Sequence, residues 1–362
     1  MCYVPPGAAK TQIEGPLSQA ARSVPRSAQI TRMSPSKKAR TEPAPFSGMH
    51  ILSCDQFDEA MLRTLFETAS AMKAMVAAKA KSDLLQGKIL ANVFFEPSTR
   101  TMCSFDAAMK RLGGDVISIS ESTSSAKKGE TIEDTIRCLQ CYCDVLVMRH
   151  PTKGTAAKAA AAASKPVINA GDGVGEHPTQ ALLDLFTVIA AHDRVNQEID
   201  LRSLTLALVG DLKHGRTVHS LARLVTKLSR PPSLTMVAPS SLTMPASICD
   251  ELAHAGLTVN TEPELKRALP SADVLYVTRV QRERFGSEAE YHAVAGTYVI
   301  DSAAMVAAKS DMIIMHPLPR VDEIAPEVDS DPRAKYFEQM ENGMYVRMAL
   351  LALVLGADLT HL

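Results

Sequence analysis

Short apolar runs alternate with segments of helical periodicity along most of the chain. In the first half, the apolar runs predict buried strands at 89–95, 115–120, 144–148 and 166–169. Apolar residues at helical spacing predict helices at 57–76, 104–112, 130–142, 155–164 and 178–192. Strands separated by helices in this way are typical of parallel sheets with both faces covered.

The second half repeats the alternation after a polar connection at 192–202. Its predicted strands lie at 204–209, 234–238, 273–278, 298–300 and 312–315, and its predicted helices at 217–228, 246–255 and 264–269. A last apolar helix at 340–355 is expected to pack back on the first half. The predicted fold class is α/β, with two doubly wound parallel-sheet domains and a cleft between them. The predicted boundaries are 48–193, 194–335 and a C-terminal segment at 336–362.

Residues 1–47 differ from the rest of the chain. They are rich in Pro, Ser and Ala, show no apolar periodicity, and carry only basic charges between Pro16 and Thr41. A disordered tail, a linker and an organelle transit peptide all have this composition. We expect disorder without a catalytic role and a cytoplasmic location, with an organelle as the alternative if the segment is a transit peptide.

Composition narrows the classes of function. The chain has 362 residues, of which 46% are apolar and 22% charged, and a formal net charge of −1. This balance is ordinary for a globular protein of two domains. The small net charge argues against nucleic acid or an anionic membrane as the main partner. No uninterrupted apolar stretch approaches the ~18 residues that cross a bilayer.

Three of the seven cysteines form a C-x-x-C-x-C motif at Cys138, Cys141 and Cys143. Zinc binding is one interpretation, but no second pair of Cys or His lies at a ligand-like distance. Buried, reduced thiols on a helix that leads into the next strand are the favoured interpretation. We therefore expect no metal site and a reducing compartment.

Polar residues gather immediately after the predicted strands. The clusters lie at 96–101, 149–150, 169–177, 211–216, 279–281 and 316–320. In open α/β sheets, ligands bind beyond the carboxyl ends of the strands. Because both halves contribute such clusters, we expect one site at the domain interface.

The cluster at 96–101 lies between a strand and a helix, which predicts an anion site. Free backbone N–H groups and the positive end of the helix dipole meet there. Ser98, Thr99, Arg100 and Thr101 add side-chain donors suited to a phosphate dianion. An ordinary N-cap is the alternative, but a guanidinium beside three hydroxyls favours the anion site.

Several cations are expected to converge on the same cleft, namely Arg100, Lys128, Arg149, Arg216 and Arg279. These charges would repel one another without anions between them, so the ligands should carry about four negative charges. A phosphate dianion and a dicarboxylate meet this requirement, and two arginines suit a bidentate grip on the dicarboxylate. A surface ion pair is the alternative for each arginine alone.

Two further motifs face the same site. Lys128 lies on a Ser/Thr-rich loop at 121–129, which suits a lid over anions, although a plain solvated loop is the alternative. His177 opens a predicted helix, where a lowered pKa would keep the imidazole neutral and able to donate to a developing oxyanion. Gln180, one turn later, can recognise an amide-like group. A structural histidine is the alternative interpretation of His177.

With these residues assembled, the chain resembles the aspartate transcarbamoylase (aspartate carbamoyltransferase) family. The resemblance rests on Glu-Pro-Ser-Thr-Arg-Thr at 96–101, Lys-Gly-Glu-Thr at 128–131, Val-Met-Arg-His-Pro at 147–151, His-Pro-Thr-Gln at 177–180, Val-Gly-Asp-Leu-Lys-His-Gly-Arg-Thr-Val-His at 209–219 and His-Pro-Leu-Pro-Arg at 316–320. It covers the chain from about residue 49 onward. The chain is most similar to the eukaryotic kind of this enzyme, which is often fused to other pyrimidine-pathway enzymes.

The resemblance implies carbamoyl transfer from carbamoyl phosphate to the amine of L-aspartate in pyrimidine synthesis, without metal or cofactor. The first domain would bind carbamoyl phosphate and the second aspartate. The implied carbamoyl-phosphate ligands are Ser98, Thr99, Arg100, Thr101, Arg149, His177, Gln180, Leu318 and Pro319. The implied aspartate ligands are Lys128, Arg216, Arg279 and Gln281. The implied catalytic residues are Arg100, Thr101, Lys128, Arg149, His177 and Gln180.

The resemblance also implies an assembly. Ser124 and Lys128 would reach the active site of a neighbouring subunit in a homotrimer, and Glu96 would pair with Arg216 and Arg284 when the domains close. One departure from the family pattern is Ala126, which precedes two lysines where some relatives have glycine. This change removes no ligand.

Three other classes of protein are alternatives. Ornithine transcarbamoylase shares the phosphate half, but ornithine has a cationic side chain, for which Arg279 and Gln281 are unsuitable. That family also typically has a cysteine where this chain has Pro317. A nucleotide-binding or regulatory module on the same fold would need a G-x-G-x-x-G motif, which does not follow the strand at 204–209. A catalytically inactive homologue used for assembly is opposed by the complete set of expected ligands.

Overall fold

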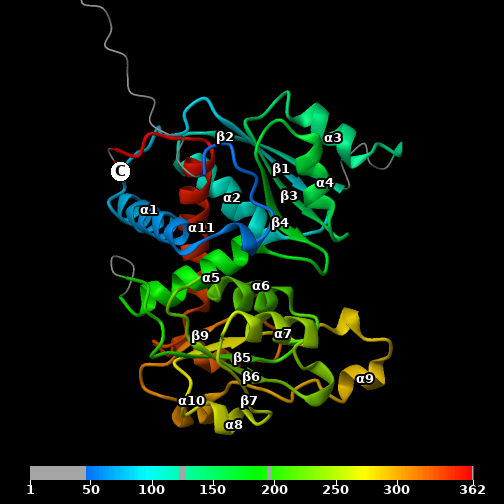
Figure 1. Ribbon diagram of the computed structural model, residues 1–362, viewed down its shortest axis with the longest axis vertical. Coiled ribbons are helices and arrows are strands. Elements are labelled where there is room, and N and C mark those ends of the chain that lie inside the picture. The colour runs from blue at the N-terminus through cyan, green and yellow to red at the C-terminus, as the bar shows by residue number, and fades with distance from the viewer. Residues whose placement is uncertain (1–45, 122–127, 194–197, 361) are drawn as a thin grey trace, which may run out of the picture. The chain divides into compact units, whose positions relative to one another are not determined.

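The first four strands form one parallel sheet. The computed structural model describes residues 46–121, 128–193, 198–360 and 362, which belong to a single unit. The strands are β1 (Ile89–Phe94), β2 (Asp115–Ser120), β3 (Val145–His150) and β4 (Val167–Asp172), in the order β2-β1-β3-β4. Figure 1 shows this sheet in the upper lobe, which we call the first lobe.

Helices cover both faces of this sheet. They are α1 (Glu59–Ala77), α2 (Thr99–Arg111), α3 (Ile132–Leu139), α4 (Thr155–Ala162), α5 (Pro178–Ala191) and the C-terminal α11 (Tyr336–Val354). Side chains of β1 alternate between the two layers: Leu90 and Phe94 join the core formed with α1, α2, α5 and α11, whereas Ala91 and Val93 face α3 and α4. Helix α11 therefore returns from the far end of the chain to complete the first lobe, beside α1 and α2 (Figure 1).

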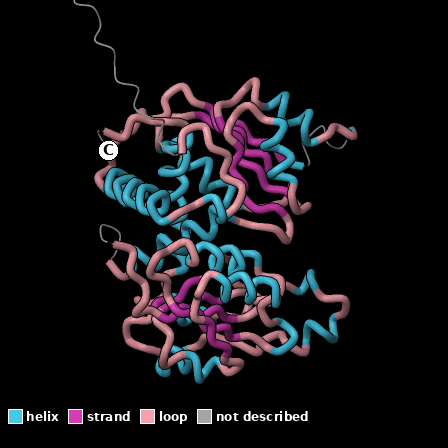
Figure 2. The backbone as a smooth tube through the Cα atoms, viewed as in Figure 1, coloured by secondary structure: helices cyan, strands magenta, loops and turns pink. Residues whose placement is uncertain are grey.

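The second lobe has a parallel sheet of its own. Its strands are β5 (Thr205–Val209), β6 (Ser233–Val237), β7 (Val259–Thr261), β8 (Val274–Val277) and β9 (Ile313–Met315), in the order β7-β6-β5-β8-β9. Its helices are α6 (Arg216–Val225), α7 (Ala246–His254), α8 (Leu265–Ala268), α9 (Glu288–His292) and α10 (Ser302–Ala307). Figure 2 shows the two groups of strands, each with helices around it. Two parallel-sheet α/β lobes confirm the predicted fold class.

Each sheet has one point where the winding of the chain reverses. It lies between β1 and β3 in the first sheet and between β5 and β8 in the second. Such switch points leave a crevice beyond the carboxyl ends of the two strands. The segment 96–101 follows β1, Arg149 is the second-last residue of β3, Asp211 follows β5, and Arg279 follows β8. The topology thus brings four of the predicted clusters to two crevices.

Several predicted elements differ from the structure. No strand forms at 298–300, where Ile300 makes only an isolated bridge to Ile324. The edge strand β7 was not predicted, because its three residues are partly or fully exposed and two of them are polar. Cys138 and Cys141 are exposed, so the prediction of buried thiols holds only for Cys143. Cys138 lies in the last turn of α3, and Cys141 lies just beyond its C-cap, Gln140.

Within the described ranges, no helix combines the length and apolar character that a bilayer span requires. The described residues also contain no group of three or more His, Cys, Asp or Glu side chains placed to hold a metal ion. The cysteine motif of α3 is accordingly not part of such a group.

Candidate active site

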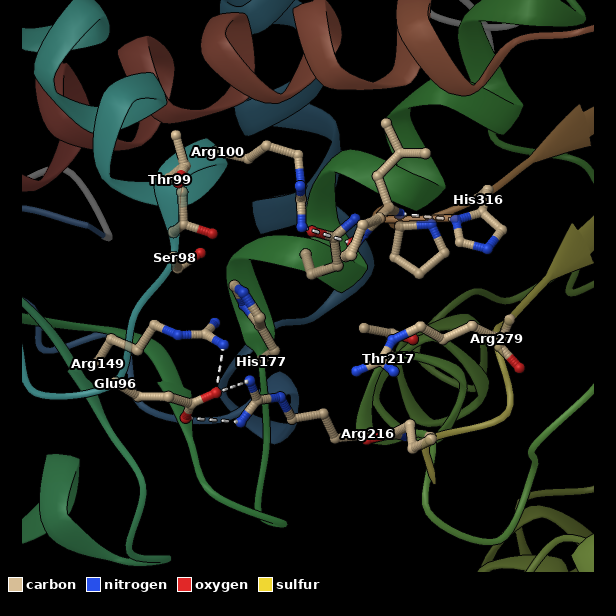
Figure 3. Close-up of a pocket in the computed structure, with 18 of the residues that line it drawn as sticks. Glu96, Ser98, Thr99, Arg100, Arg149, His177, Arg216, Thr217, Arg279 and His316 are labelled. Atoms are coloured by element: carbon tan, nitrogen blue, oxygen red, sulfur yellow. Dashed lines mark hydrogen bonds and ion pairs between the residues drawn. The ribbon is translucent and has the colours of Figure 1, made fainter. Parts of the chain in front are cut away.

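A pocket of about 580 Å³ lies where the two lobes meet. It is lined from the first lobe by the β1–α2 segment, the end of β3 and the start of α5. The second lobe contributes the start of α6 and the segments after β8 and β9, and α11 adds Met340 and Arg347. Figure 3 shows Arg100, Arg149, His177, Arg216 and Arg279 around this space.

Helix α2 begins at the pocket, five residues earlier than the sequence predicted. Ser98 occupies the N-cap position, but its side chain makes no capping hydrogen bond. The first-turn N–H groups have no acceptor within the helix, and Thr99, Arg100 and Thr101 lie on that first turn. The segment is therefore a helix N-terminus whose hydroxyl and amide donors are open to an anion.

Arg100 reaches across the pocket toward the second lobe. Its Nη2 donates to the carbonyl oxygen of Leu318 at 2.8 Å. Leu318 has a left-handed backbone (φ 52°), and its N–H donates to Nδ1 of His316 at 2.8 Å. Burial and then the charge of Arg279 lower the pKa of Arg100. Arg100 and Arg279 thus share one crevice although they come from different lobes.

Glu96 carries the single carboxylate among the described lining residues, and two arginines bind it. Arg149 Nη2 donates to Glu96 Oε1 at 2.6 Å, and Arg216 Nη2 donates to the same oxygen at 3.0 Å (Figure 3). Burial would raise the pKa of Glu96, but the charges of these two arginines lower it below its usual value. Glu96 is therefore ionised and bridges the lobes.

Arg149 is buried in the lining of the pocket. Its Nη1 donates to the carbonyl oxygen of Ala170 at 3.1 Å, while its buried Nε has no hydrogen-bond partner. Burial, followed by the charge of Arg216, lowers the pKa of Arg149 to about 10. A buried guanidinium with an unsatisfied N–H is a strong potential donor to an anionic or polarised oxygen.

Gly171 makes room for both guanidiniums. Its φ of 115° lies in the region that favours glycine, and an added Cβ would lie 3.0 Å from Arg149 Nη1 and 3.5 Å from Arg216 Cζ. A side chain at this position would strain the backbone and crowd the two arginines.

His177 is the N-cap of α5 and is buried beside these arginines. Burial first, and then the charges of Arg149, Arg216 and Arg347, lower the pKa of His177 well below its usual value. Its backbone N–H donates to Ser220 Oγ of α6 at 3.2 Å, which fixes the residue between the lobes. The imidazole is therefore neutral and suited to donate a hydrogen bond to a developing oxyanion.

A buried carboxylate organises the second-lobe side of the pocket. Asp211, which is fully buried, accepts hydrogen bonds from the backbone N–H of His214 at 3.0 Å and from that of Gln281 at 3.4 Å. Nδ1 of His214 lies 3.1 Å from both carboxylate oxygens. Asp211 thereby holds the segment after β5 against the segment that carries Arg279 and Gln281.

Two family models match the chain in sequence order. The carbamoyl-P binding domain of aspartate/ornithine carbamoyltransferase matches residues 49–190, and the Asp/Orn binding domain matches residues 202–354. The chain belongs to the aspartate/ornithine carbamoyltransferase family. The first match falls on the first lobe, and the second covers the second lobe together with α11, which packs back on the first.

Relatives of this chain include both long and short proteins. The multifunctional protein CAD of Squalus acanthias is 53% identical over 312 residues, which cover 86% of this chain but only 14% of the relative. The aspartate carbamoyltransferase catalytic subunit of Haloarcula marismortui is 48% identical over 85% of this chain and 98% of its own. The aspartate transcarbamoylase of Trypanosoma cruzi, solved with carbamoyl phosphate and aspartate, is 44% identical with a TM-score of 0.81, covering 86% of this chain and 98% of that one.

Most of the residues predicted for the carbamoyltransferase site line the pocket. They are Glu96, Ser98, Thr99, Arg100, Thr101, Arg149, His177, Gln180, Arg216, Arg279, Gln281, Arg284, Leu318 and Pro319. Lys128 is exposed and does not line it, and Ser124 lies outside the described residues. Arg284 lines the pocket, but the described ion pairs of Glu96 are with Arg149 and Arg216, so its pairing with Glu96 stays a prediction for a ligand-bound state.

Sequence reasoning missed some lining residues of this family member. They include Ser104, Leu183, Met340 and Arg347. The sequence contained a signal for two of them. Ser104 follows Arg100 by four positions, which places both residues on one face of α2. Arg347 is a lone cation in an apolar stretch. Arg347 is buried, and its Nη1 donates to Ser104 Oγ at 2.9 Å.

Proposed function

We propose that the chain is an aspartate carbamoyltransferase that transfers the carbamoyl group of carbamoyl phosphate to L-aspartate in pyrimidine biosynthesis. The observation that carries this proposal is the charge of the pocket. Its described lining contains six arginines and a single acidic residue, Glu96. Guanidiniums at such density need polyanionic ligands, and carbamoyl phosphate with aspartate supplies them.

The β1–α2 segment suits the phosphate of carbamoyl phosphate. Ser98, Thr99, Arg100 and Thr101 place hydroxyl, amide and guanidinium donors at one helix N-terminus. Thr101, Arg149 and neutral His177 line the same pocket and would donate to the carbonyl oxygen. These donors would stabilise the negative charge that develops on that oxygen when the amine attacks.

The second lobe suits the aspartate. Arg279 and Gln281, with Arg216, present donors to two carboxylates. Ornithine would place a side-chain ammonium here, and Glu96, the only acid in the described lining, is already bound to two arginines. This arrangement favours aspartate over ornithine.

The proposed reaction is a simple acyl transfer. The amine nitrogen of aspartate attacks the carbamoyl carbon, the new C–N bond forms, and the bond from carbon to the phosphate oxygen breaks. The amine loses a proton, for which the departing phosphate is the nearest strong acceptor. Holding two polyanions together in the correct geometry supplies most of the acceleration in this scheme.

The proposal includes an assembly. Lys128 would enter the site of a neighbouring subunit of a homotrimer together with Ser124. The chain matches 14% of the length of the multifunctional relatives, which supports the expectation that it works with other enzymes of the pathway, fused or associated.

The proposal is tested by a product assay with carbamoyl phosphate and either L-aspartate or L-ornithine. We expect N-carbamoyl-L-aspartate from the first mixture and no citrulline from the second. Carbamoylation of ornithine but not of aspartate would overturn the substrate assignment. The absence of both products would overturn the activity itself.

A further inference from the structure

A fully buried carboxylate lies directly behind the pocket residue Gln180. Asp184, one turn later on α5, accepts a hydrogen bond from Gln180 Nε2 on Oδ1 at 2.8 Å. The same oxygen accepts from Gln339 Nε2 of α11 at 2.6 Å, and Oδ2 accepts from the Tyr276 hydroxyl of β8 at 2.7 Å. Asp184 thus collects one donor from each of three elements: α5, α11 and β8.

The surroundings of Asp184 allow it to act as an acceptor. Burial raises the pKa of Asp184 to about 7. The hydrogen bonds from Tyr276, Gln339 and Gln180 lower the pKa, and so does the charge of Arg347, but burial has the larger effect. Arg347 is buried in the same region. Three donors fit a carboxylate, which can only accept.

This contact decides which end of the Gln180 side chain faces the pocket. A carboxamide has one donor end and one acceptor end. One N–H of its nitrogen is bound to Asp184, so the nitrogen end faces Asp184 and the oxygen is the acceptor that remains for a ligand in the pocket that Gln180 lines. In the opposite orientation, two oxygens would face each other at hydrogen-bond distance, which a carboxylate does not tolerate.

We propose that Asp184 is a positioning residue that turns the carboxamide oxygen of Gln180 toward the substrate and so selects an acyl phosphate that carries an NH₂ group. This inference rests on the proposed function and deepens it. Carbamoyl phosphate offers N–H donors to that oxygen. Acetyl phosphate has a methyl group at the same place and leaves the acceptor unpaired, which carries a penalty in a buried site.

A purely structural role of Asp184 predicts a different result. As a tie between α5, α11 and β8, Asp184 would affect stability, and its loss would slow reactions with both acyl phosphates alike. As a positioning residue, it affects the ratio of kcat/KM for carbamoyl phosphate to kcat/KM for acetyl phosphate. The ratio therefore separates the two roles.

The experiment measures this ratio with L-aspartate as the acceptor. Asp184→Leu, which removes the acceptor, is expected to lower the ratio about tenfold, and the isosteric Asp184→Asn about threefold. The matched control is Thr187→Val, since Thr187 accepts from Asn342 Nδ2 at 3.2 Å and joins the same two helices one turn away. The control should leave the ratio unchanged.

A double-mutant cycle tests whether Asp184 acts through Gln180. In a Gln180→Ala background, Asp184→Asn should lower the ratio no further. An unchanged ratio in folded Asp184→Leu overturns the proposal, as does an equal effect of Thr187→Val. If Asp184→Leu does not fold, an unchanged ratio in Asp184→Asn overturns it. Failure of the wild-type protein to use carbamoyl phosphate at all would instead contradict the proposed function.

Discussion

Glu96 of the first lobe and Arg216 of the second form an ion pair across the pocket, with 3.0 Å between Oε1 and Nη2. The same Glu96 oxygen accepts from Arg149 at 2.6 Å. One carboxylate therefore stands between two guanidiniums that would otherwise repel each other, and it joins the predicted phosphate side to the predicted aspartate side.

Replacing Glu96 should weaken the contact that holds the two lobes together at the site. In Glu96→Gln, Arg149 and Arg216 lose their shared counter-charge, so closure around both substrates becomes less favourable. We expect kcat/KM for aspartate to fall about tenfold to hundredfold, the range for loss of charge-assisted hydrogen bonds. Glu251→Gln is the control, because Glu251 pairs with Arg223 at 2.7 Å at a more exposed position. Equal kinetics for Glu96→Gln and the control would contradict this role.

Arg279→Ala should affect one substrate selectively. Arg279 lines the second-lobe side, where the dicarboxylate is expected. We expect KM for aspartate to rise about a hundredfold with a much smaller change in KM for carbamoyl phosphate. Initial rates with each substrate varied in turn give both constants. A larger change in KM for carbamoyl phosphate than in KM for aspartate would contradict the assignment of Arg279 to the aspartate side.

The shared site can be tested with two inactive variants. Arg100→Ala removes a pocket residue, whereas Lys128→Ala removes an exposed residue outside this chain's own pocket. If Lys128 serves a neighbouring subunit, a trimer of both variants contains at least one site with neither defect. Mixing after mild dissociation should restore about a third of the wild-type activity in mixed trimers. Mixtures no more active than their parts would indicate sites built from single chains.

The strand-end clusters were predictable because their chemistry and their place in the fold agree. Glu96, Arg149 and Arg279 follow buried apolar strands whose carboxyl ends must meet a crevice, so residue type and position point to the same site. Asp184 and Arg347 were not found in this way, because they lie inside apolar helices and their partners come from distant segments. Pairings such as that of Asp184 with Tyr276 depend on how the lobes and α11 pack, which periodicity does not specify.

Gly343 should be intolerant of alanine, although alanine is the better helix former. It lies within α11, where an added Cβ would approach Arg347 Nη1 and Leu183 Cδ2 of α5, each at 2.9 Å. We expect Gly343→Ala to lower the free energy of unfolding by about 1–3 kcal/mol, as overpacking does. Gly286→Ala is the control, since its Cβ would meet only Glu290 Oε2 at 3.6 Å. Equal urea midpoints for the two variants would count against close packing of α5 and α11.

His177 should make stability depend on pH in a definite direction. Burial and nearby arginines lower the pKa of His177 in the folded protein, whereas the unfolded chain protonates near pH 6.5. The unfolded state thus binds more protons as the pH falls below about 6.5, so the stability present above that pH is lost progressively at lower pH. His219, also buried with a lowered pKa, acts in the same direction.

In His177→Gln, the free energy of unfolding should therefore decrease less steeply as the pH is lowered from about 6.5 to 5, by up to ~1.4 kcal/mol per pH unit. Urea unfolding of both proteins across this range measures the difference, and identical slopes would mean that His177 titrates normally in the folded protein.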